Sequence, residues 1–253
     1  MTAFAPGKEL TGKIALVTGA GINIGRATAL SLADAGATVA VNTRTSREAA
    51  ERVVKEITAG GGKAELCMAD IADAAQVKQM VDSILARHGR IDILVLNASV
   101  RREVRFVDMS FEQWQVPLSI SLDGSFHCIK AVLPSMIASG GGNIIALTGS
   151  NVLTGAIGKV HSSAAKSGLT GMIRALAREV GPMGIRANCV SPGIINTTRP
   201  GHRSPRRDAK GLVPLERYGE SEEIAATVRF LCGPGGGYIT GQTVHVNGGQ
   251  MMF

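Results

Sequence analysis

The amino-acid sequence predicts an α/β fold in which one doubly wound parallel sheet of about seven strands is covered by helices on both faces. Apolar, β-branched runs alternate with helical patterns along the whole chain. These runs are apolar throughout instead of at every second residue, which is typical of strands buried on both faces. The 253 residues are 45% hydrophobic and 19% charged, a composition that suits one large core. We therefore predict a single domain spanning residues 1–253.

The expected elements follow one another in a regular order. Strands are expected at residues 13–18, 37–42, 63–68, 92–97, 143–148, 185–191 and 243–247. Helices are expected at residues 24–35, 47–57, 73–88, 110–138, 158–180 and 221–232. Thr45 and Glu48 have the spacing of a capping box at the start of the second helix. Pro117 lacks a backbone donor and predicts an interruption in the fourth helix.

The composition argues against several classes of protein. No apolar run approaches the ~20 residues that a membrane-spanning helix needs. The opening residues, MTAFAPGKEL, lack the layout of a secretory signal. The four cysteines lie far apart with no CxxC pair, so neither a zinc site nor a disulfide framework is expected. We predict a soluble cytoplasmic protein that binds no metal and whose cysteines fill the core.

Much of the net charge of +7 comes from two short stretches. Residues 196–210 hold five basic residues against one acidic residue, and residues 101–105, RREVR, hold three against one. Arginines pair with phosphate through two parallel hydrogen bonds, so one hypothesis is an acidic ligand, such as a CoA thioester, an acyl carrier protein or a phosphorylated metabolite. The alternative is a solvated loop without a ligand. Nucleic acid is not expected, because no aromatic side chains stand between the arginines.

A glycine-rich turn links the first expected strand to its helix. Residues 17–29, VTGAGINIGRATA, place Gly19, Gly21 and Gly25 between the two elements. Glycines at this point allow a tight turn and let a pyrophosphate approach the backbone at the helix N-terminus. The pattern is weak on its own, but directly after the first strand of a βαβ unit it indicates a dinucleotide site.

At this turn the sequence resembles the short-chain dehydrogenase/reductase family, closest in style to its 3-oxoacyl-acyl-carrier-protein reductases, and the resemblance covers nearly the whole chain. The family's TGxxxGxG turn is matched at Thr18, Gly19, Ile24 and Gly25, and Asn23 stands where the middle glycine is usual. Asparagine tolerates positive φ better than other non-glycine residues, so we expect the turn to persist. The resemblance implies a Rossmann-like dinucleotide-binding domain.

Other marks of the family follow in chain order. Asp70, in MADIAD, resembles the acid that binds adenine, and NAS at residues 97–99 stands where NAG is usual. SPGIINT at residues 191–197 resembles the segment that holds the nicotinamide carboxamide, and residues 238–249 resemble the family's final strand. By resemblance, the cofactor contacts are Gly19, Asn23, Ile24, Gly25, Asp70, Ile71, Asn97, Ala98, Lys166, Pro192, Gly193, Ile195 and Thr197.

The end of the second strand bears on the type of nucleotide. An acidic residue there accepts the ribose 2′-hydroxyl of NAD, whereas a nearby arginine suits the 2′-phosphate of NADP. Thr43 occupies the place of the acid, and Arg44 follows it. We therefore expect NADP(H) to be favoured over NAD(H); the alternative is that Arg44 is an ordinary surface charge.

The family's catalytic tetrad is largely absent from the matching positions. By resemblance, hydride transfer uses Asn, Ser, Tyr and Lys, with Tyr and Lys four residues apart on one face of a helix. Lys166 matches the lysine, and Ser162 stands at the tyrosine position. Gly149, next to Ser150, stands at the serine position, and Ser121 stands at the asparagine position. We therefore read Lys166 as a ligand of the cofactor ribose whose catalytic neighbour is missing.

Serine is a poor chemical substitute for tyrosine at position 162. The pKa of tyrosine is ~10, whereas that of an unactivated hydroxyl is close to water at ~15.7, a gap of roughly 8 kcal/mol. His161 has a pKa suited to acid–base work; its alternative is a subunit contact or a surface position. Ser150 is a candidate for binding a carbonyl oxygen, or it is a helix cap or turn residue.

Two functions remain open. The first is an oxidoreductase that moves hydride between NADP(H) and a carbonyl or alcohol, with a modified site of Lys166, Ser150, Ser162 and His161 and weak or absent activity by the usual route. Its substrate is a small molecule or an acyl thioester, acidic ones included. The second is a catalytically silent subunit beside an intact homologue. The resemblance also implies a homodimer or homotetramer and a substrate lid over about residues 196–215.

Overall fold

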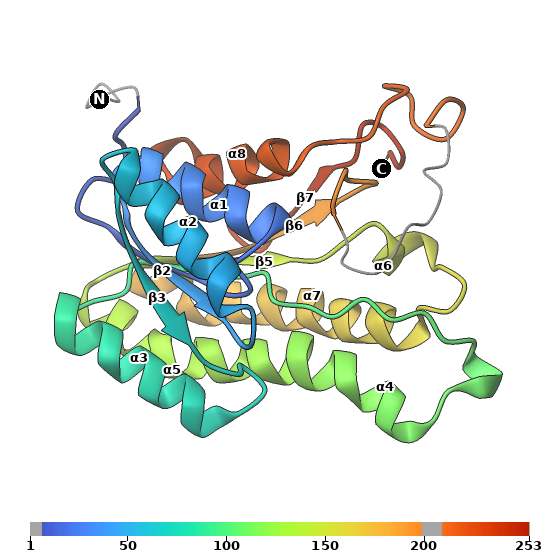
Figure 1. Cartoon of the computed structure of the whole chain (residues 1–253), viewed down its shortest axis with the longest axis horizontal. Helices are drawn as coiled ribbons and strands as arrows, with labels where there is room; N and C mark the ends of the chain where they lie inside the picture. The colour runs from blue at the N-terminus through green and yellow to red at the C-terminus, as the bar shows by residue number, and fades with distance from the viewer. Residues whose placement is uncertain (1–6, 199–208, 253) are drawn as a thin grey trace.

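A seven-stranded parallel sheet forms the centre of the molecule (Figure 1). The computed structural model describes residues 7–198 and 209–252. The strands are β1 Ile14–Val17, β2 Thr38–Thr43, β3 Lys63–Met68, β4 Ile93–Leu96, β5 Gly142–Leu147, β6 Ile185–Pro192 and β7 Thr243–Val246. Their order across the sheet is β3, β2, β1, β4, β5, β6, β7. Because the order reverses between β1 and β4, a crevice opens there beyond the carboxyl ends of the strands.

Helices cover both faces of the sheet. They are α1 Asn23–Asp34, α2 Arg47–Ala59, α3 Ala74–His88, α4 Phe111–Leu118, α5 Gly124–Ala138, α6 Asn151–Thr154, α7 Val160–Val180 and α8 Ser221–Cys232. One core lies between the sheet and α1, α2 and α8, and the other between the sheet and α3, α5 and α7. Figure 1 shows these two sets of helices on opposite sides of the sheet. The predicted doubly wound α/β fold is confirmed.

The strands are apolar at successive positions because each side chain meets a buried face. In β4, Ile93 and Val95 belong to one core, and Leu94 and Leu96 belong to the other. Successive side chains of a strand point to opposite faces of its sheet. The uninterrupted apolar runs in the sequence therefore indicate strands that are buried on both faces, as expected for a parallel sheet.

The long helical stretch after β4 is interrupted next to Pro117, as the sequence predicts. α4 ends at Leu118, and a π-helical turn over Ser119–Asp123 joins it to α5. Proline lacks the donor for a helical hydrogen bond, and single π-turns often occur at functional sites. The turn carries buried Ser121, whose Oγ donates to Ser99 Oγ at 3.5 Å. The interruption therefore places Ser121, which stands at the position of the tetrad asparagine, beside the loop that follows β4.

The expected capping box of Thr45 with Glu48 is wrong. α2 starts one residue later than that box requires, and its N-cap is Ser46, whose side chain makes no capping hydrogen bond. A capping box occurs instead before α4, where Ser110 Oγ accepts from the backbone of Gln113 and the Gln113 side chain accepts from the backbone of Ser110. The S-x-x-Q signal for that box is present in the sequence.

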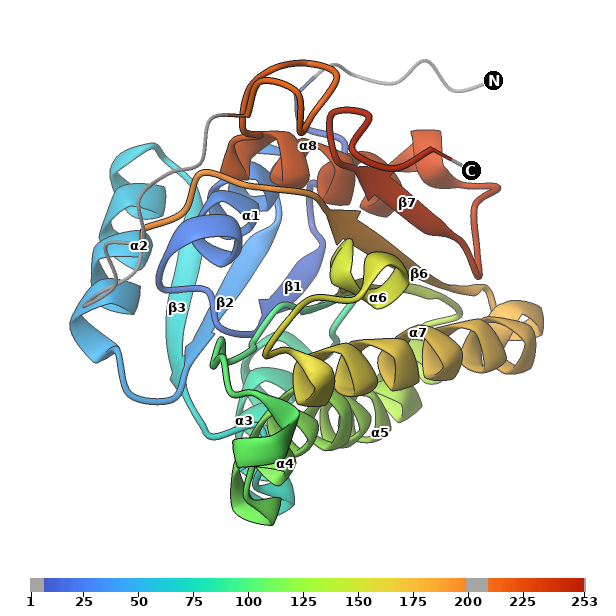
Figure 2. The ribbon, with the colours of Figure 1, turned by 90° about the vertical axis from the view of Figure 1, so that its right-hand side faces the viewer.

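The loops at the carboxyl edge of the sheet surround the crevice. The turn after β1, the loop over residues 97–105 after β4 and the segment over residues 193–198 after β6 all begin at this edge. Figure 2 shows α4, α6 and the start of α7 gathered beside one another, and α7 contacts both α4 and α6. Over residues 7–198 and 209–252, no helix combines the length and the apolar character needed to cross a membrane.

Candidate functional site

The turn between β1 and α1 is built for close approach of backbone to backbone. A Cβ atom on Gly25 would lie 2.3 Å from the carbonyl oxygen of Gly19 and 2.5 Å from Asn97 Nδ2. Only glycine avoids these contacts. α1 also has no capping side-chain hydrogen bond and no acidic residue in its first turn. Its first N–H groups therefore remain available for an anionic ligand.

Asn97 and Thr18 fix this turn against the end of β4. Asn97 Nδ2 donates to the carbonyl oxygens of Thr18 and Gly19, at 2.9 Å each. Thr18 Oγ1 accepts from the backbone N–H groups of Asn97 and Ala98 at 3.0 and 3.1 Å. The side-chain amide of Asn97 is thus used to hold the turn, although the residue also lines the crevice.

The crevice beyond β1, β2 and β4 holds a cavity of about 460 Å³, here called the outer cavity. It brings together most of the positions that the sequence assigns to the cofactor. These are Gly19, Asn23, Ile24, Gly25, Thr43, Arg44, Asp70, Ile71, Asn97, Ala98 and Thr197. Residues from five separate loops converge on one concave surface at the point where the strand order reverses, which is where nucleotides bind in open α/β sheets.

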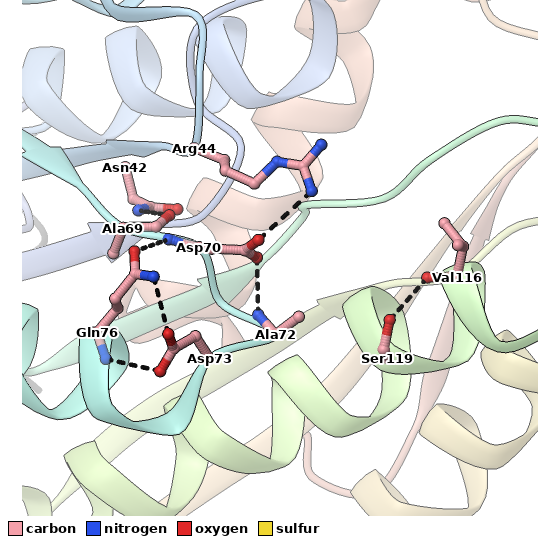
Figure 3. Close-up of polar contacts among 9 residues, drawn as sticks. All are labelled: Asn42, Arg44, Ala69, Asp70, Ala72, Asp73, Gln76, Val116 and Ser119. Atoms are coloured by element: carbon pink, nitrogen blue, oxygen red, sulfur yellow. Dashed lines mark hydrogen bonds and ion pairs between the residues drawn. The ribbon is translucent and has the colours of Figure 1, made fainter. Parts of the chain in front are cut away.

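Arg44 and Asp70 face each other at one end of the outer cavity (Figure 3). Arg44 Nη1 lies 3.4 Å from Asp70 Oδ2, and Asp70 Oδ1 accepts from the backbone of Ala72 at 3.0 Å. Beside them, Asn42 Nδ2 donates to the carbonyl oxygen of Ala69 at 3.2 Å, which ties β2 to the chain after β3. An exposed ion pair contributes only about 0.2–1 kcal/mol. Arg44 can therefore leave Asp70 for a phosphate at little cost.

Asn23 adopts the conformation that its position requires and also makes a long-range contact. Its φ is +51°, within the left-handed region. Asn23 Oδ1 accepts from the backbone N–H and the hydroxyl of Thr198, at 3.0 and 3.1 Å, and Asn23 Nδ2 donates to the carbonyl oxygen of Thr198 at 3.0 Å. Both residues line the outer cavity. These hydrogen bonds, here called the Asn23 clasp, fasten the segment after β6 to the glycine-rich turn.

A second cavity of about 300 Å³, here called the inner cavity, adjoins the first. It gathers the remaining predicted positions, which are Ser150, Ser162, Lys166, Pro192, Gly193 and Ile195. Ile24, Asn97, Ser99, Val100 and Arg101 line both cavities. The two cavities therefore form one continuous site that runs from the end of β2 to the start of α7.

The segment after β6 closes the inner cavity from the side of β7. The backbone of Gly193 donates to the carbonyl oxygen of Val246 at 3.0 Å, and a Cβ atom on Gly193 would lie 2.7 Å from the Cα of Asn247. Further along, Thr197 Oγ1 accepts from Arg101 Nη1 at 3.4 Å. The close packing of Gly193 fixes the start of this segment, and Arg101 reaches its other end from the loop after β4.

Lys166 projects from α7 towards the end of β5. Its Nζ donates to the carbonyl oxygen of Leu147 at 2.5 Å. Burial, together with the nearby positive charge of Arg101, lowers the pKa of Lys166 to about 8. Removing an ammonium from water disfavours its charged form, and a second cation does the same. Lys166 therefore loses its proton far more readily than an ordinary lysine.

This shift has a consequence for stability that depends on pH. Between the folded pKa of about 8 and the ordinary 10.5, the unfolded chain binds more protons than the folded protein, so the contribution of Lys166 to stability rises as pH rises. We expect the free energy of unfolding of Lys166→Met, relative to that of the wild type, to be highest at pH 7. This difference should fall by about 2–3 kcal/mol towards pH 10.5. Urea unfolding of both proteins across this range measures it. A difference that does not change with pH would contradict the assignment.

The two serines near Lys166 differ in how their hydroxyls are used. Ser162 Oγ donates to the carbonyl oxygen of Lys159 at 3.1 Å, one turn earlier in the chain. Ser150 is buried at the start of α6, and its side chain makes no capping hydrogen bond there. Ser150 is the N-cap residue of α6 by position, and it also lines the inner cavity.

His161 does not line either cavity. It lies on the stripe of α7 that carries Ala165 and Leu169 into the core, and it is fully buried. Neither ring nitrogen meets a hydrogen-bond partner within the described part of the chain. Burial lowers the pKa of His161. The expected surface position is wrong, and the structure does not bring this imidazole to the site.

The structure describes only part of the expected lid, but it describes both tyrosines. Part of the basic stretch and of the lid expected at about residues 196–215 lies outside them, at residues 199–208. The two tyrosines of the chain are both described, and neither Tyr218 nor Tyr238 lines a cavity. Residues 7–198 and 209–252 contain no group of His, Cys, Asp and Glu side chains that could hold a metal ion.

Sequence reasoning did not assign several residues that line the site. Ser99 and Thr198 line the cavities from the loops after β4 and β6, Lys159 lines the inner cavity from the start of α7, and Asn42 supports the outer cavity from β2. Asn42 had a signal, since it is a polar residue in an otherwise apolar strand. The others had none, because their roles depend on contacts between distant loops.

Comparisons with known proteins agree with this architecture. The family described as enoyl-(acyl carrier protein) reductase matches residues 19–251. A 3-oxoacyl-[acyl-carrier-protein] reductase of Synechocystis sp. is 42% identical over 245 residues, which cover 96% of this chain and 99% of that protein. The 3-oxoacyl-[acyl-carrier-protein] reductase FabG of Thermotoga maritima is 35% identical over 246 residues, which cover 96% of this chain and 100% of that protein. A solved structure of a mutant short-chain dehydrogenase/reductase from Serratia marcescens matches with a TM-score of 0.90 and 34% identity, over 96% of this chain and 99% of that one.

Proposed function

This chain belongs to the short-chain dehydrogenase/reductase family of oxidoreductases, and we propose that it binds NADP(H) across its two cavities while hydride transfer by the family's usual route is weak or absent. The nominal substrate is a carbonyl or alcohol compound, acyl thioesters included, and the site of action is the cytoplasm. The observation that carries the proposal is that Lys166 lines the inner cavity with Ser162, and no tyrosine, four residues before it.

The residues of the outer cavity fit a dinucleotide phosphate. The uncapped start of α1 and the cradle that only Gly25 permits suit a pyrophosphate. Arg44 and the neighbouring Thr43 suit a 2′-phosphate, since no carboxylate stands at the end of β2. When bound, NADP(H) supplies or accepts the hydride. By the family resemblance, Lys166 would hold the ribose and the segment of Pro192, Gly193, Ile195 and Thr197 would hold the carboxamide.

Proton transfer is the step that this site lacks. Reduction of a carbonyl requires a proton for the developing oxyanion, and a positioned acid contributes a factor of about 10²–10⁴. Ser162 donates its hydroxyl to the carbonyl oxygen of Lys159, and its acidity is far below that of a phenol. Ser150 can donate a hydrogen bond to the oxygen of a substrate, but it cannot replace the proton source. We infer slow chemistry with intact cofactor binding.

Titration of the protein with NADPH and with NADH tests the cofactor assignment. We expect NADPH to bind about tenfold more tightly, because a hydrogen bond between Arg44 and a charged phosphate is worth about 1.5–3 kcal/mol. Nicotinamide fluorescence reports both affinities. In Arg44→Gln the preference should disappear, because NADPH weakens while NADH stays unchanged. If neither nucleotide binds, the proposed function is wrong.

Removal of the Asn23 clasp should make cofactor exchange faster. Asn23→Gly keeps the positive φ at no cost and removes all three hydrogen bonds to Thr198. Because these bonds fasten the mouth of the outer cavity, we expect NADPH to dissociate about tenfold faster. Stopped-flow displacement of bound NADPH measures the rate.

Thr198→Val is the matched control for this variant. It removes only the hydroxyl bond and keeps both backbone bonds of the clasp, so its effect should be small. Equal dissociation rates in Asn23→Gly and the wild type would show that the clasp does not gate the cofactor.

A second candidate function is a catalytically silent subunit that binds cofactor and assembles with copies of itself or with an intact homologue. The exposed apolar side chains of Phe111 on α4, Phe126 on α5 and Val160 on α7 favour this candidate. Large exposed apolar groups become buried when two proteins associate. A homodimer or homotetramer is expected, and light scattering of the purified protein reports its mass. A monomer at all concentrations would count against this function.

A further inference from the structure

The inner cavity is lined by cations and by no acid. Its charged lining residues are Arg101, Arg102, Lys159 and Lys166, and no aspartate or glutamate of the described chain lines it. The outer cavity differs, because there Arg44 is paired with Asp70. Clefts lined by one sign of charge concentrate ligands of the opposite sign.

The positive charges act on one another within this space. Arg101 lies near enough to Lys166 to oppose its protonation. Lys159 is paired with Glu103 at 3.2 Å, and Glu103 does not line the cavity. Among the described residues that line the cavity with Arg101, Arg102 and Lys166, there is no such carboxylate. Like charges held together in a partly buried site raise its free energy unless an anion joins them.

The loop RREVR places its arginines differently. Arg101 lines both cavities and donates to Thr197 across their junction, and Arg102 lines the inner cavity alone. Arg105 lines neither cavity. Two of the three arginines therefore belong to the site, and the third provides an internal comparison within the same loop.

We propose that the inner cavity binds a small anionic substrate, a carbonyl or alcohol compound that carries a carboxylate or phosphate, and that Arg101, Arg102 and Lys159 hold its negative charge. This inference rests on the proposed function: the nicotinamide end of the cofactor would lie against Lys166 and the segment after β6, and the substrate would lie beside it, next to Arg101, Arg102 and Lys159. Arginine is suited to both anions because its fork pairs with two oxygens.

Binding to the NADPH-loaded protein tests this without any turnover. The probes are 3-hydroxybutyrate, its neutral methyl ester and glycerol 3-phosphate; an alcohol with the reduced cofactor forms a dead-end complex. Calorimetry should show at least one anion binding about tenfold or more tightly than the ester. Which anion binds identifies the charged group. Equal affinity for all three probes, or no binding by either anion, would overturn the proposal.

Variants of the basic residues show which of them hold the negative charge of the ligand. Arg102→Gln and Lys159→Gln should each weaken the anion about tenfold and leave the ester unchanged, while Arg105→Gln should change neither. Melting temperatures confirm that each variant folds. Equal losses in Arg105→Gln and Arg102→Gln would contradict an anion held inside the cavity.

The test separates this inference from the proposed function. If NADPH does not bind, the proposed function fails, and the comparison of anion with ester on the cofactor-free protein still reports on the inner cavity. If NADPH binds and the anions show no advantage over the ester, only the anionic substrate is wrong.

Discussion

The double variant Ser162→Tyr with Gly149→Ser should reduce ketones with NADPH about 100-fold faster than the wild-type protein, or more, because a positioned acid contributes about 10²–10⁴. A tyrosine at position 162 lies one helical turn before Lys166, on the same face of α7. The cationic ammonium then lowers the pKa of the phenol. The rate of NADPH oxidation in the presence of a ketone measures the gain.

Both substituted positions line the inner cavity. A Cβ atom on Gly149 would meet no atom within 4 Å, and Gly149 and Ser162 both line the inner cavity of about 300 Å³. A serine at position 149 therefore fits without displacing a neighbour, and position 162 is half-buried beside the cavity. The activity, which we propose to be weak, is therefore expected to rise when these groups are restored.

Ser167→Tyr is the matched control. It adds the same phenol to α7 at an exposed position next to Lys166 that does not line the cavity, so the rate should stay at the wild-type level. If the double variant folds and binds NADPH but reduces ketones no faster than this control, the loss of activity does not lie at positions 149 and 162.

Gly25→Ala should abolish tight NADPH binding, with an affinity loss of about 100-fold or more. The added Cβ atom would lie 2.3 Å from the Gly19 carbonyl oxygen and 2.9 Å from the Cα of Ala20. These contacts are with backbone, which cannot turn away as a side chain can. The turn must therefore open, and the N–H groups at the start of α1 no longer point towards the pyrophosphate. NADPH titration by fluorescence measures the loss.

Gly21→Ala provides the comparison in the same turn. Its Cβ atom would come no closer than 3.5 Å to its nearest neighbour, Ala49 Cβ, and Gly21 also lines the outer cavity. We expect a change in affinity of less than about tenfold. Similar losses of NADPH affinity in both variants would contradict this explanation. They would mean that any methyl group in the turn blocks the cofactor, and that the close backbone approach at Gly25 is not the cause.

The order of strands and helices was predictable because local patterns carry it. Runs such as the one containing Ile93 to Leu96 are apolar at each position, and both faces of β4 are in fact buried. The start of α2 was not predictable from one spacing rule, since Thr45 and Ser46 both favour an N-cap and the helix begins after Ser46. Adjacent polar residues of similar cap preference leave a boundary undecided.

The walls of the site were only partly predictable. The turn residues around Gly25 follow from the sequence because the backbone requirement is local. The Asn23 clasp could not be foreseen, since its partner Thr198 is 175 residues away. The charge of the RREVR loop suggested an acidic ligand, but only the fold separates Arg101 and Arg102, which line the inner cavity, from Arg105. A count of charges does not tell which side chains face a cavity.

The most direct test of an intact cofactor site without its proton donor is the turnover of the wild-type protein at saturating NADPH. The median enzyme turns over about ten substrate molecules per second, and loss of acid–base catalysis slows an enzyme by about 10²–10⁴. With ketones, 3-oxoacyl thioesters and small oxo acids as substrates, we expect NADPH to bind and to be oxidised at about 0.1 s⁻¹ or slower. Oxidation at about 1 s⁻¹ or faster would contradict the account, because some group other than a tyrosine would then be delivering the proton beside Lys166.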